Sequence, residues 1–264
     1  MSISSLKNDW AEQDPNVWWK YTCTAIKRVC KESNIDPKKI ISIGISYQMH
    51  GLVIVDKNGE PLRDSIIWCD SRAVNIGSDA YEKLGEDKCM SHLLNSPGNF
   101  TASKLKWVKE NEPGVYEKIY KYMLPGDFIA YKLTGEINTT RNGLSEGIIW
   151  DYKNNEIANW LLDFYGINPN LTPDLVDNFT NQGATNSKSS EETGLNIGIP
   201  ITYRAGDQPN NALALNVFDN GEVAASGGTS GVIYSITNDI NSKEPSRINH
   251  FAHVNYNDNN KSIG

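Results

Sequence analysis

Two short apolar segments that end in small and polar residues constrain the fold of this chain most. Residues 39–45 alternate isoleucine with serine and glycine, which predicts a strand with one apolar face and one small-residue face. Residues 199–205 predict a second strand, which ends at Gly206-Asp207-Gln208 and precedes a small-residue helix over 209–218. Predicted helices and strands alternate along the chain, as they do in α/β proteins. The sequence therefore predicts an α/β fold with polar groups at the ends of its strands.

Periodicity and turn chemistry predict further elements. Asp14 followed by Pro15 is typical of a helix start, because aspartate caps a helix and proline fits its first turn. The apolar residues that follow recur at helical spacing and predict one buried face, made of Trp18, Thr22, Ala25, Ile26 and Val29. Residues 52–55 and 61–68 predict the strands of a hairpin around the turn Asp56-Lys57-Asn58-Gly59. Further expected segments are helices over 74–95, 101–111 and 154–165, extended chain over 138–150, and a surface excursion over 177–190.

Composition and charge narrow the class of protein. The 264 residues allow one large domain or two modest ones. The net charge of −7 disfavours nonspecific binding to nucleic acid or to an anionic membrane, because both repel an acidic surface. No apolar run approaches the roughly 18 to 20 residues of a membrane helix, and no secretory signal pattern occurs over Met1–Trp10. We expect a cytoplasmic protein with four reduced thiols, at Cys23, Cys30, Cys69 and Cys89.

Asp207 is the most informative single residue. It stands between a predicted strand and a predicted helix, at the edge of the sheet where α/β proteins place their ligands. A carboxylate there is able to take a proton from a substrate hydroxyl as that oxygen attacks phosphorus. Aspartate at the start of a helix is also a routine capping residue. Position alone leaves both roles open.

A glycine-rich run follows one helix and one strand after Asp207. Gly227-Gly228-Thr229-Ser230-Gly231 offers converging backbone amides and two hydroxyl donors, which is the chemistry of a phosphate-binding nest. Tight hairpins use the same residues, and the GxxxxGK[ST] pattern of a P-loop is absent. The pairing of this run with Asp207 is more informative than either motif.

A third group of polar residues, Gln48-Met49-His50, ends the first strand and precedes a glycine. Glutamine and histidine offer donors and acceptors that suit sugar hydroxyls, although a lone histidine is more often structural. Asp70 and Arg72, two residues apart after the predicted hairpin, either bind a polar ligand or pair with each other. Asn99 follows a Pro-Gly turn, where it lines the same cleft or only shapes the loop.

Taken in order, these segments resemble the FGGY family of carbohydrate kinases over nearly the whole chain. The resemblance is strongest to members that phosphorylate xylulose, whose SGQMHG segment is similar to residues 46–51, with Tyr47 in place of the usual glycine. The other matching segments are Trp10–Pro15, the WxDxR-like Ile67–Arg72, the LPxDYxxxxLTGE-like Leu124–Glu136, the GDN- or GDQ-like Gly206–Gln208, and the phosphate motif Gly228–Gly231.

The resemblance implies an actin-like ATPase fold, built from ribonuclease-H-like domains with the active site between them. It implies that Asp207 is the catalytic base for the terminal hydroxyl of D-xylulose. The implied sugar contacts are Gln48, Met49, His50, Asn99 and Gln208. ATP phosphates would be held by Gly228, Thr229, Ser230 and Gly231, with Mg²⁺ bridging them and no protein ligand to the metal identified. A homodimer is compatible with the resemblance.

The resemblance also implies domain boundaries. Residues 1–218 correspond to the N-terminal, sugar-binding domain without its first phosphate-binding strands, since no DxGTSxxK motif occurs over Met1–Trp10. Residues 219–264 correspond to the beginning of the nucleotide-binding domain. We therefore expect no measurable kinase activity from this 264-residue chain alone. The alternatives are a family kinase acting on gluconate, ribulose or glycerol, and a non-catalytic sugar-binding protein; Met49-His50 favours xylulose.

Overall fold

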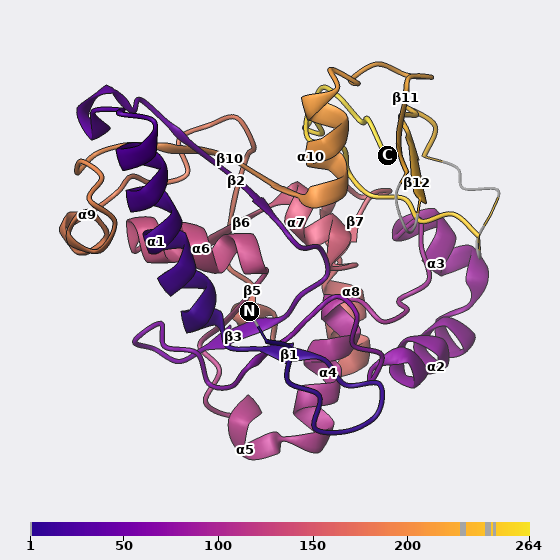
Figure 1. Ribbon diagram of the computed structural model, residues 1–264. Coiled ribbons are helices and arrows are strands. Elements are labelled where there is room, and N and C mark those ends of the chain that lie inside the picture. The colour runs from indigo at the N-terminus through magenta and orange to yellow at the C-terminus, as the bar shows by residue number, and fades with distance from the viewer. Residues whose placement is uncertain (1, 228–230, 241–243, 245–246) are drawn as a thin grey trace.

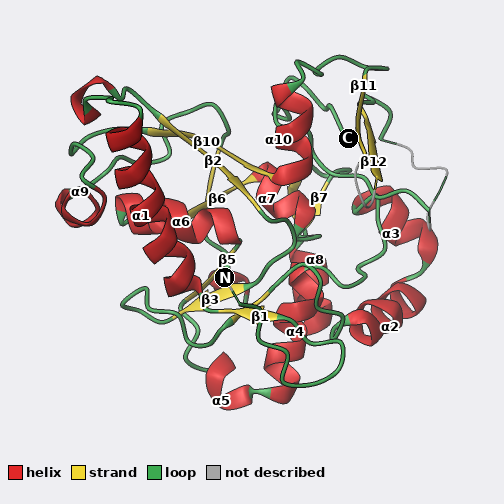
Figure 2. Cartoon of the chain, viewed as in Figure 1, coloured by secondary structure: helices red, strands yellow, loops and turns green. Residues whose placement is uncertain are grey.

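The computed structural model describes residues 2–227, 231–240, 244 and 247–264 (Figure 1). The helices of this part are α1 (Pro15–Glu32), α2 (Val74–Leu84), α3 (Glu86–His92), α4 (Thr101–Asn111), α5 (Pro113–Tyr116), α6 (Pro125–Thr134), α7 (Arg141–Glu146), α8 (Asn159–Tyr165), α9 (Ser187–Thr193) and α10 (Asp207–Ala214). Its strands are β1 (Glu12–Gln13), β2 (Ile43–Tyr47), β3 (Val53–Val55), β4 (Ser65–Ile66), β5 (Lys121–Met123), β6 (Asn138–Thr140), β7 (Trp150–Asp151), β8 (Glu156–Ile157), β9 (Asp174–Val176), β10 (Ile201–Gly206), β11 (Val223–Gly227) and β12 (Gly231–Ser235). Figure 2 shows helices around short strands, which confirms the expected α/β class. No helix within the described ranges has the length and apolar character needed to cross a membrane.

The parallel strands β2 and β10 lie side by side and form the frame of the site. Their register runs from Ile201 opposite Ile43 to Gly206 opposite Tyr47, so both strands end at the same edge. Both strands were expected from the sequence, although β2 begins at Ile43 and leaves Ile41 84% exposed. Among the described residues β2 has no second partner strand, and together with α1 it lines an open groove of about 560 Å³.

Helix α1 begins as predicted and departs from the prediction in its second half. The Asp14 side chain accepts a hydrogen bond from the Asn16 amide at 2.8 Å. Trp19 is buried, and α1 packs against α6 and α9. The predicted buried face is wrong further along, because Ala25 is exposed and Val29 is 56% exposed. Ala25 and Ile26 line the groove beside β2, and Ile26 also packs against the core cluster that β2 and α6 share.

The hairpin expected over residues 52–68 forms only in part. β3 pairs with β5 and β4 pairs with β1, so each half of the expected hairpin has a different main partner. Isolated bridges join Leu52 to Ile66 and Val55 to Pro61. The turn itself is as predicted, with Gly59 at a φ of 77°. The local sequence therefore predicted the turn, but it did not predict the partner strands, which come from distant parts of the chain.

The segment 138–150 is a second correction, because α7 interrupts the expected extended chain. The Thr140 hydroxyl caps this helix by accepting from the Gly143 amide at 3.1 Å. Gly143 also allows close approach, since a Cβ there would lie 2.6 Å from the Leu124 side chain. The last residue of this helix, Glu146, lies next to the ends of β2 and β10, at Tyr47 and Gly206.

A buried ion pair fixes α6 against β10. Arg204 Nη1 lies 3.2 Å from Asp127 Oδ1, and both side chains are almost completely buried. The other carboxylate oxygen of Asp127 accepts from the Leu124 amide at the start of α6. Burial raises the pKa of Asp127, and the Arg204 guanidinium opposes that shift. The pair therefore locks the helix start to the strand that leads to Asp207.

The segment after β12 returns to the main core. Phe251, Tyr256 and Ile263 pack with the apolar residues of α4 and α8. Asn95 exchanges two hydrogen bonds with the His250 backbone, at 2.6 and 3.0 Å. α10, β11 and β12 share a smaller, separate cluster of apolar side chains. This packing brings the chain's last residues back beside the ends of β2 and β10.

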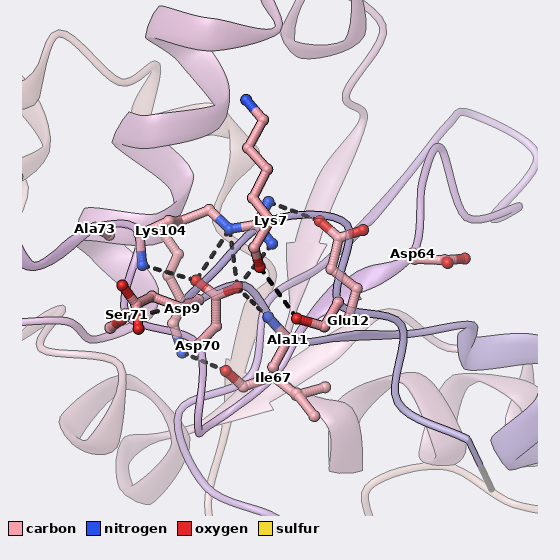
Figure 3. A network of polar contacts seen from close by, with 12 residues as sticks. Lys7, Asp9, Ala11, Glu12, Asp64, Ile67, Asp70, Ser71, Ala73 and Lys104 are labelled. Atoms are coloured by element: carbon pink, nitrogen blue, oxygen red, sulfur yellow. Dashed lines mark hydrogen bonds and ion pairs between the residues drawn. The ribbon is translucent and has the colours of Figure 1, made fainter.

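Asp70 and Arg72 form the centre of a buried polar network (Figure 3). The guanidinium lies 2.7 Å from Asp70 and 2.6 Å from Glu12, and its charged carbon stands 3.8 Å from the Trp10 ring centroid. The Ala11 amide donates to Asp70 at 2.6 Å. Of the two roles that the sequence left open for Asp70 and Arg72, the structure shows mutual pairing. The network ties the N-terminal segment to the loop after β4.

We predict that Asp70→Ala lowers the free energy of unfolding by roughly 3–5 kcal/mol, because it removes one of the two carboxylates that pair with the buried Arg72 charge. Urea denaturation followed by tryptophan fluorescence measures the change. The matched control is Arg28→Ala, which breaks a pair whose side chains are 73% and 61% exposed, and it should cost less than about 1 kcal/mol. Equal losses in the two variants would contradict the assignment.

Candidate active site

A cavity of about 640 Å³ lies at the ends of β2 and β10. It brings together three predicted sugar contacts, Met49, His50 and Gln208. The full lining is Met49, His50, Gln208, Val232, Ile233, Tyr234, Ser235, Thr237, Arg247, Ile248, Asn249, His250, Phe251 and Gly264. Segments from opposite ends of the chain therefore close one cavity around these three residues.

His50 is held rigidly at the wall of this cavity. Its backbone has a φ of 60°, in the left-handed region that non-glycine residues seldom adopt. Its ring Nδ1 lies 2.9 Å from the Glu146 carbonyl oxygen, and its ring centroid lies 4.8 Å from Phe100 and 5.1 Å from Phe251. Burial lowers the pKa of His50 to about 4, so the ring is neutral near pH 7. Because a carbonyl only accepts, Nδ1 carries the proton and Nε2 is left as an acceptor for a ligand hydroxyl.

Lys104 holds the backbone of His50 through a hydrogen bond. Its ammonium, completely buried in α4, donates to the His50 carbonyl at 2.8 Å and to the Ile67 carbonyl at 2.9 Å. Burial lowers the pKa of Lys104 to about 8, and the nearby Asp70 carboxylate opposes that shift. The left-handed turn at His50 is thus fixed by a hydrogen bond from a charged donor, a strong kind of hydrogen bond in proteins.

Asp207 is the first residue of α10 and adjoins Gln208 at the cavity. Gly206 occupies the cap position, so Asp207 is not the helix cap that its position also suggested. Its Oδ1 accepts from the Gln208 backbone amide at 3.1 Å and its Oδ2 from the Gln208 side-chain amide at 3.5 Å, and the residue is exposed. Partial burial raises the pKa of Asp207, which the Gln208 amide opposes. A general base gains from a pKa that moves toward the working pH.

Other predicted residues are placed elsewhere. Gln48 lines the groove between α1 and β2, and its amide lies 3.4 Å from Gln13 Oε1. Asn99 accepts from the Ala73 amide at 3.2 Å and donates to the Asp70 carbonyl, so it holds the loop. Neither residue lines the cavity of Met49 and His50.

The predicted phosphate nest is described only at its end. Gly228, Thr229 and Ser230 lie outside the described residues, whereas Gly231 begins β12 opposite Gly227. Val232, which follows Gly231, lines the cavity. The described end of the nest therefore leads directly to a residue that lines the same cavity as His50.

Three buried residues near the cavity were missed by the sequence analysis: Tyr47, Lys104 and Glu146. Lys104 carried a detectable signal, since it is a lysine between the buried Ala102 and Leu105 of a helix. Glu146 carried none, because its segment was expected to be extended. Tyr47 was noticed only as a substitution for glycine, without its contact to Glu146.

Comparison with known proteins places the chain in a family. Residues 1–214 match the profile described as "FGGY family of carbohydrate kinases, N-terminal domain". The chain belongs to the FGGY family of carbohydrate kinases. The members of this family are sugar phosphotransferases that use ATP.

Relatives in the family include xylulose and glycerol kinases. The chain is 30% identical over 248 residues to the xylulose kinase of Staphylococcus xylosus, covering 94% of this chain and 51% of that protein. It is 30% identical over 232 residues to the glycerol kinase of Thermococcus onnurineus strain NA1, covering 86% of this chain and 46% of that protein. The crystal structure of xylulose kinase from Rhodospirillum rubrum matches with a TM-score of 0.88 at 25% identity, over 99% of this chain and 53% of that one.

Two facts follow from these comparisons. The fold is that of the FGGY kinases, which confirms the expected actin-like ATPase class. The chain spans about half the length of the curated relatives that it matches.

We predict that His50 makes the FGGY chain less stable as the pH falls. Its pKa is about 4 in the folded state and about 6.5 when unfolded, so the unfolded state takes up the proton first below pH 6.5. The contribution of His50 to the free energy of unfolding is therefore complete above pH 7. It should fall by roughly 2 kcal/mol between pH 7 and pH 5. Urea denaturation at the two pH values measures the slope.

His50→Gln is the matched variant for this measurement, because glutamine does not titrate. It should reduce the slope without abolishing it, since burial also lowers the pKa of His253 to about 4. If the free energy of unfolding of His50→Gln depends on pH as steeply as that of the wild type, the pKa of His50 does not differ between the folded and unfolded states.

Proposed function

We propose that this chain binds D-xylulose and supplies the catalytic base for its ATP-dependent phosphorylation to D-xylulose 5-phosphate. The observation that carries the proposal is the convergence of Met49, His50 and Gln208 on one cavity next to Asp207. The identity to xylulose kinases supports the choice of sugar. The family's use of ATP supports the phosphoryl donor.

The residues have distinct roles in this proposal. The neutral ring of His50 accepts a hydrogen bond from a sugar hydroxyl at Nε2, and Gln208 offers both a donor and an acceptor. Asp207 takes the proton of the terminal hydroxyl while that oxygen forms its bond to phosphorus. The carboxylate suits this role because it is accessible and is oriented by the Gln208 amide.

ATP, when bound, supplies the phosphoryl group, and ADP leaves. The residues that would hold its phosphates are the amides and hydroxyls of Gly228, Thr229, Ser230 and Gly231, of which Gly231 is described. Its position at the start of β12, one residue before the cavity-lining Val232, fits that role. Mg²⁺ is expected with the phosphates. We place the reaction in the cytoplasm, in agreement with four free cysteines.

A second candidate substrate is glycerol. The specific observation in its favour is the 30% identity to a glycerol kinase over 86% of this chain. Gluconate and ribulose are further candidates from the same family. A non-catalytic sugar-binding role would use the same cavity without the proton transfer to Asp207.

Isothermal titration with D-xylulose tests the proposal without requiring turnover. We expect binding by the wild type, and a dissociation constant raised roughly 3- to 10-fold in His50→Ala, the effect of losing one hydrogen bond. Asp207→Asn should bind the sugar within about threefold of wild type, because its proposed task lies in the chemical step. Lys188→Ala, at an exposed residue of α9, is the control.

Glycerol, gluconate and ribulose are titrated in parallel. Tighter binding of one of these would replace xylulose as the substrate. A folded chain that binds none of the four compounds would contradict a sugar site in this cavity.

A further inference from the structure

Glu146 bridges the ends of the two strands that carry the site. Its side chain is only 2% exposed, at the end of α7. The Tyr47 hydroxyl at the end of β2 hydrogen-bonds its carboxyl, and the Glu146 backbone carbonyl accepts from His50 Nδ1 at 2.9 Å. At the end of β10, a Cβ added to Gly206 would lie 2.6 Å from Glu146 Oε2. One residue therefore contacts the end of β2, His50 and the residue before Asp207.

The surroundings of this carboxyl oppose a negative charge. The charged groups that face it are Asp127 from α6 and Asp207 from α10, both acidic. The nearby Arg204 of β10 is paired with Asp127, and the Lys104 ammonium beneath His50 is bound to two carbonyls. Within the described residues no ion pair includes Glu146, and its Oε1 has no hydrogen-bond partner.

A buried carboxylate without a cation takes up a proton, because desolvation penalises the charged form. Burial, reinforced by Asp127 and Asp207, raises the pKa of Glu146 well above its ordinary value, and the hydrogen bonds from Tyr47 and from the His50 backbone only partly oppose this. Tyr47 is itself a buried neutral phenol. With a proton on Glu146, the contact between Tyr47 and Glu146 is a hydrogen bond between two uncharged groups.

We propose that Glu146 is a positioning residue that acts as a neutral carboxylic acid, and that with Tyr47 it fixes His50 relative to Asp207. This rests on the proposed function insofar as the cavity between His50 and Asp207 binds the sugar. The negative charge of Asp207 disfavours ionisation of Glu146. While Glu146 keeps its proton, Asp207 carries the negative charge that a base requires.

The arrangement also explains the glycine before Asp207. A Cβ at Gly206 would lie 2.3 Å from Met49 Cγ and 2.6 Å from the Glu146 carboxyl. Any side chain there would therefore push apart the residues of the cavity wall. Glycine allows β10 to end directly against Glu146.

Carboxyl ¹³C NMR of the chain without sugar tests the proton on Glu146. With labelled glutamate and aspartate, we expect the Glu146 resonance, assigned by its loss in Glu146→Gln, to remain at the neutral-acid position from pH 6 to pH 8. The titration midpoint of Asp207 should be unchanged in Glu146→Gln. A Glu146 carboxyl that ionises below pH 8, or an Asp207 midpoint lowered in Glu146→Gln by removal of a like charge, would overturn the proposal.

Glu146→Met tests positioning, because it keeps the length of the side chain and removes the hydrogen bond to Tyr47. We expect it to shift both the Asp207 midpoint and the His50 ring ¹⁵N resonances, and Glu146→Gln to leave both at their wild-type values. Glu156→Gln, at an exposed residue of β8, is the control. Wild-type values in a folded Glu146→Met would refute a positioning role. If this variant does not fold, Tyr47→Phe, which removes the same hydrogen bond and keeps the ring, replaces it with the same expected shifts.

Sugar titration separates this proposal from the proposed function. We expect the dissociation constant for D-xylulose to rise about tenfold in Glu146→Met and to stay within about threefold in Glu146→Gln. Wild-type affinity in Glu146→Met would refute the positioning role. If the NMR results are as expected and the wild type binds no sugar, the proposed function fails while the structural role of Glu146 stands.

Discussion

The buried ammonium of Lys104 is the interaction on which the sugar end of the structure depends. It joins the turn after β2 to the loop after β4, because its two acceptors are the carbonyls of His50 and Ile67. An isolated ammonium in the core would be costly, and Asp70 provides the nearby negative charge that offsets this cost. The polar network of the N-terminal segment therefore reaches the cavity wall through Lys104. The buried charges of Lys104 and Asp70 therefore belong both to the cavity wall and to the network that holds the N-terminal segment.

The buried charges fix geometry more than they add stability. Replacing a buried ion pair by apolar groups is often neutral for stability, whereas removing one partner is strongly destabilising. Arg204 with Asp127 sets α6 against β10, and Arg72 with Asp70 sets the N-terminal segment against the loop after β4. Each ion pair permits only a narrow range of distances between the two segments that it joins. Strand ends that must meet around one ligand benefit from such constraints.

Local signals in the sequence predicted local structure, but the sequence did not predict contacts between distant segments. The two strands that frame the site, the start of α1 and the place of Asp207 after β10 were readable from alternation, capping residues and chain order. The partners of β3 and β4 were not, because strand pairing across 50 or more residues leaves no local pattern. Gln48 illustrates a second limit. The chain turns directly after Gln48, at Met49 and His50, so Met49 lines the cavity while Gln48 lines the groove beside α1.

The outer edge of β2 has a consequence for how this chain behaves in solution. Gly44 and Ser46 are exposed there, small side chains that leave the backbone accessible, and Ile41 stands almost fully in solvent just before the strand. An accessible strand edge beside an apolar groove is a template onto which a further strand can hydrogen-bond, with its side chains filling the groove. Dilution, or an added peptide that occupies this edge, would therefore favour the monodisperse state over concentration-dependent aggregates.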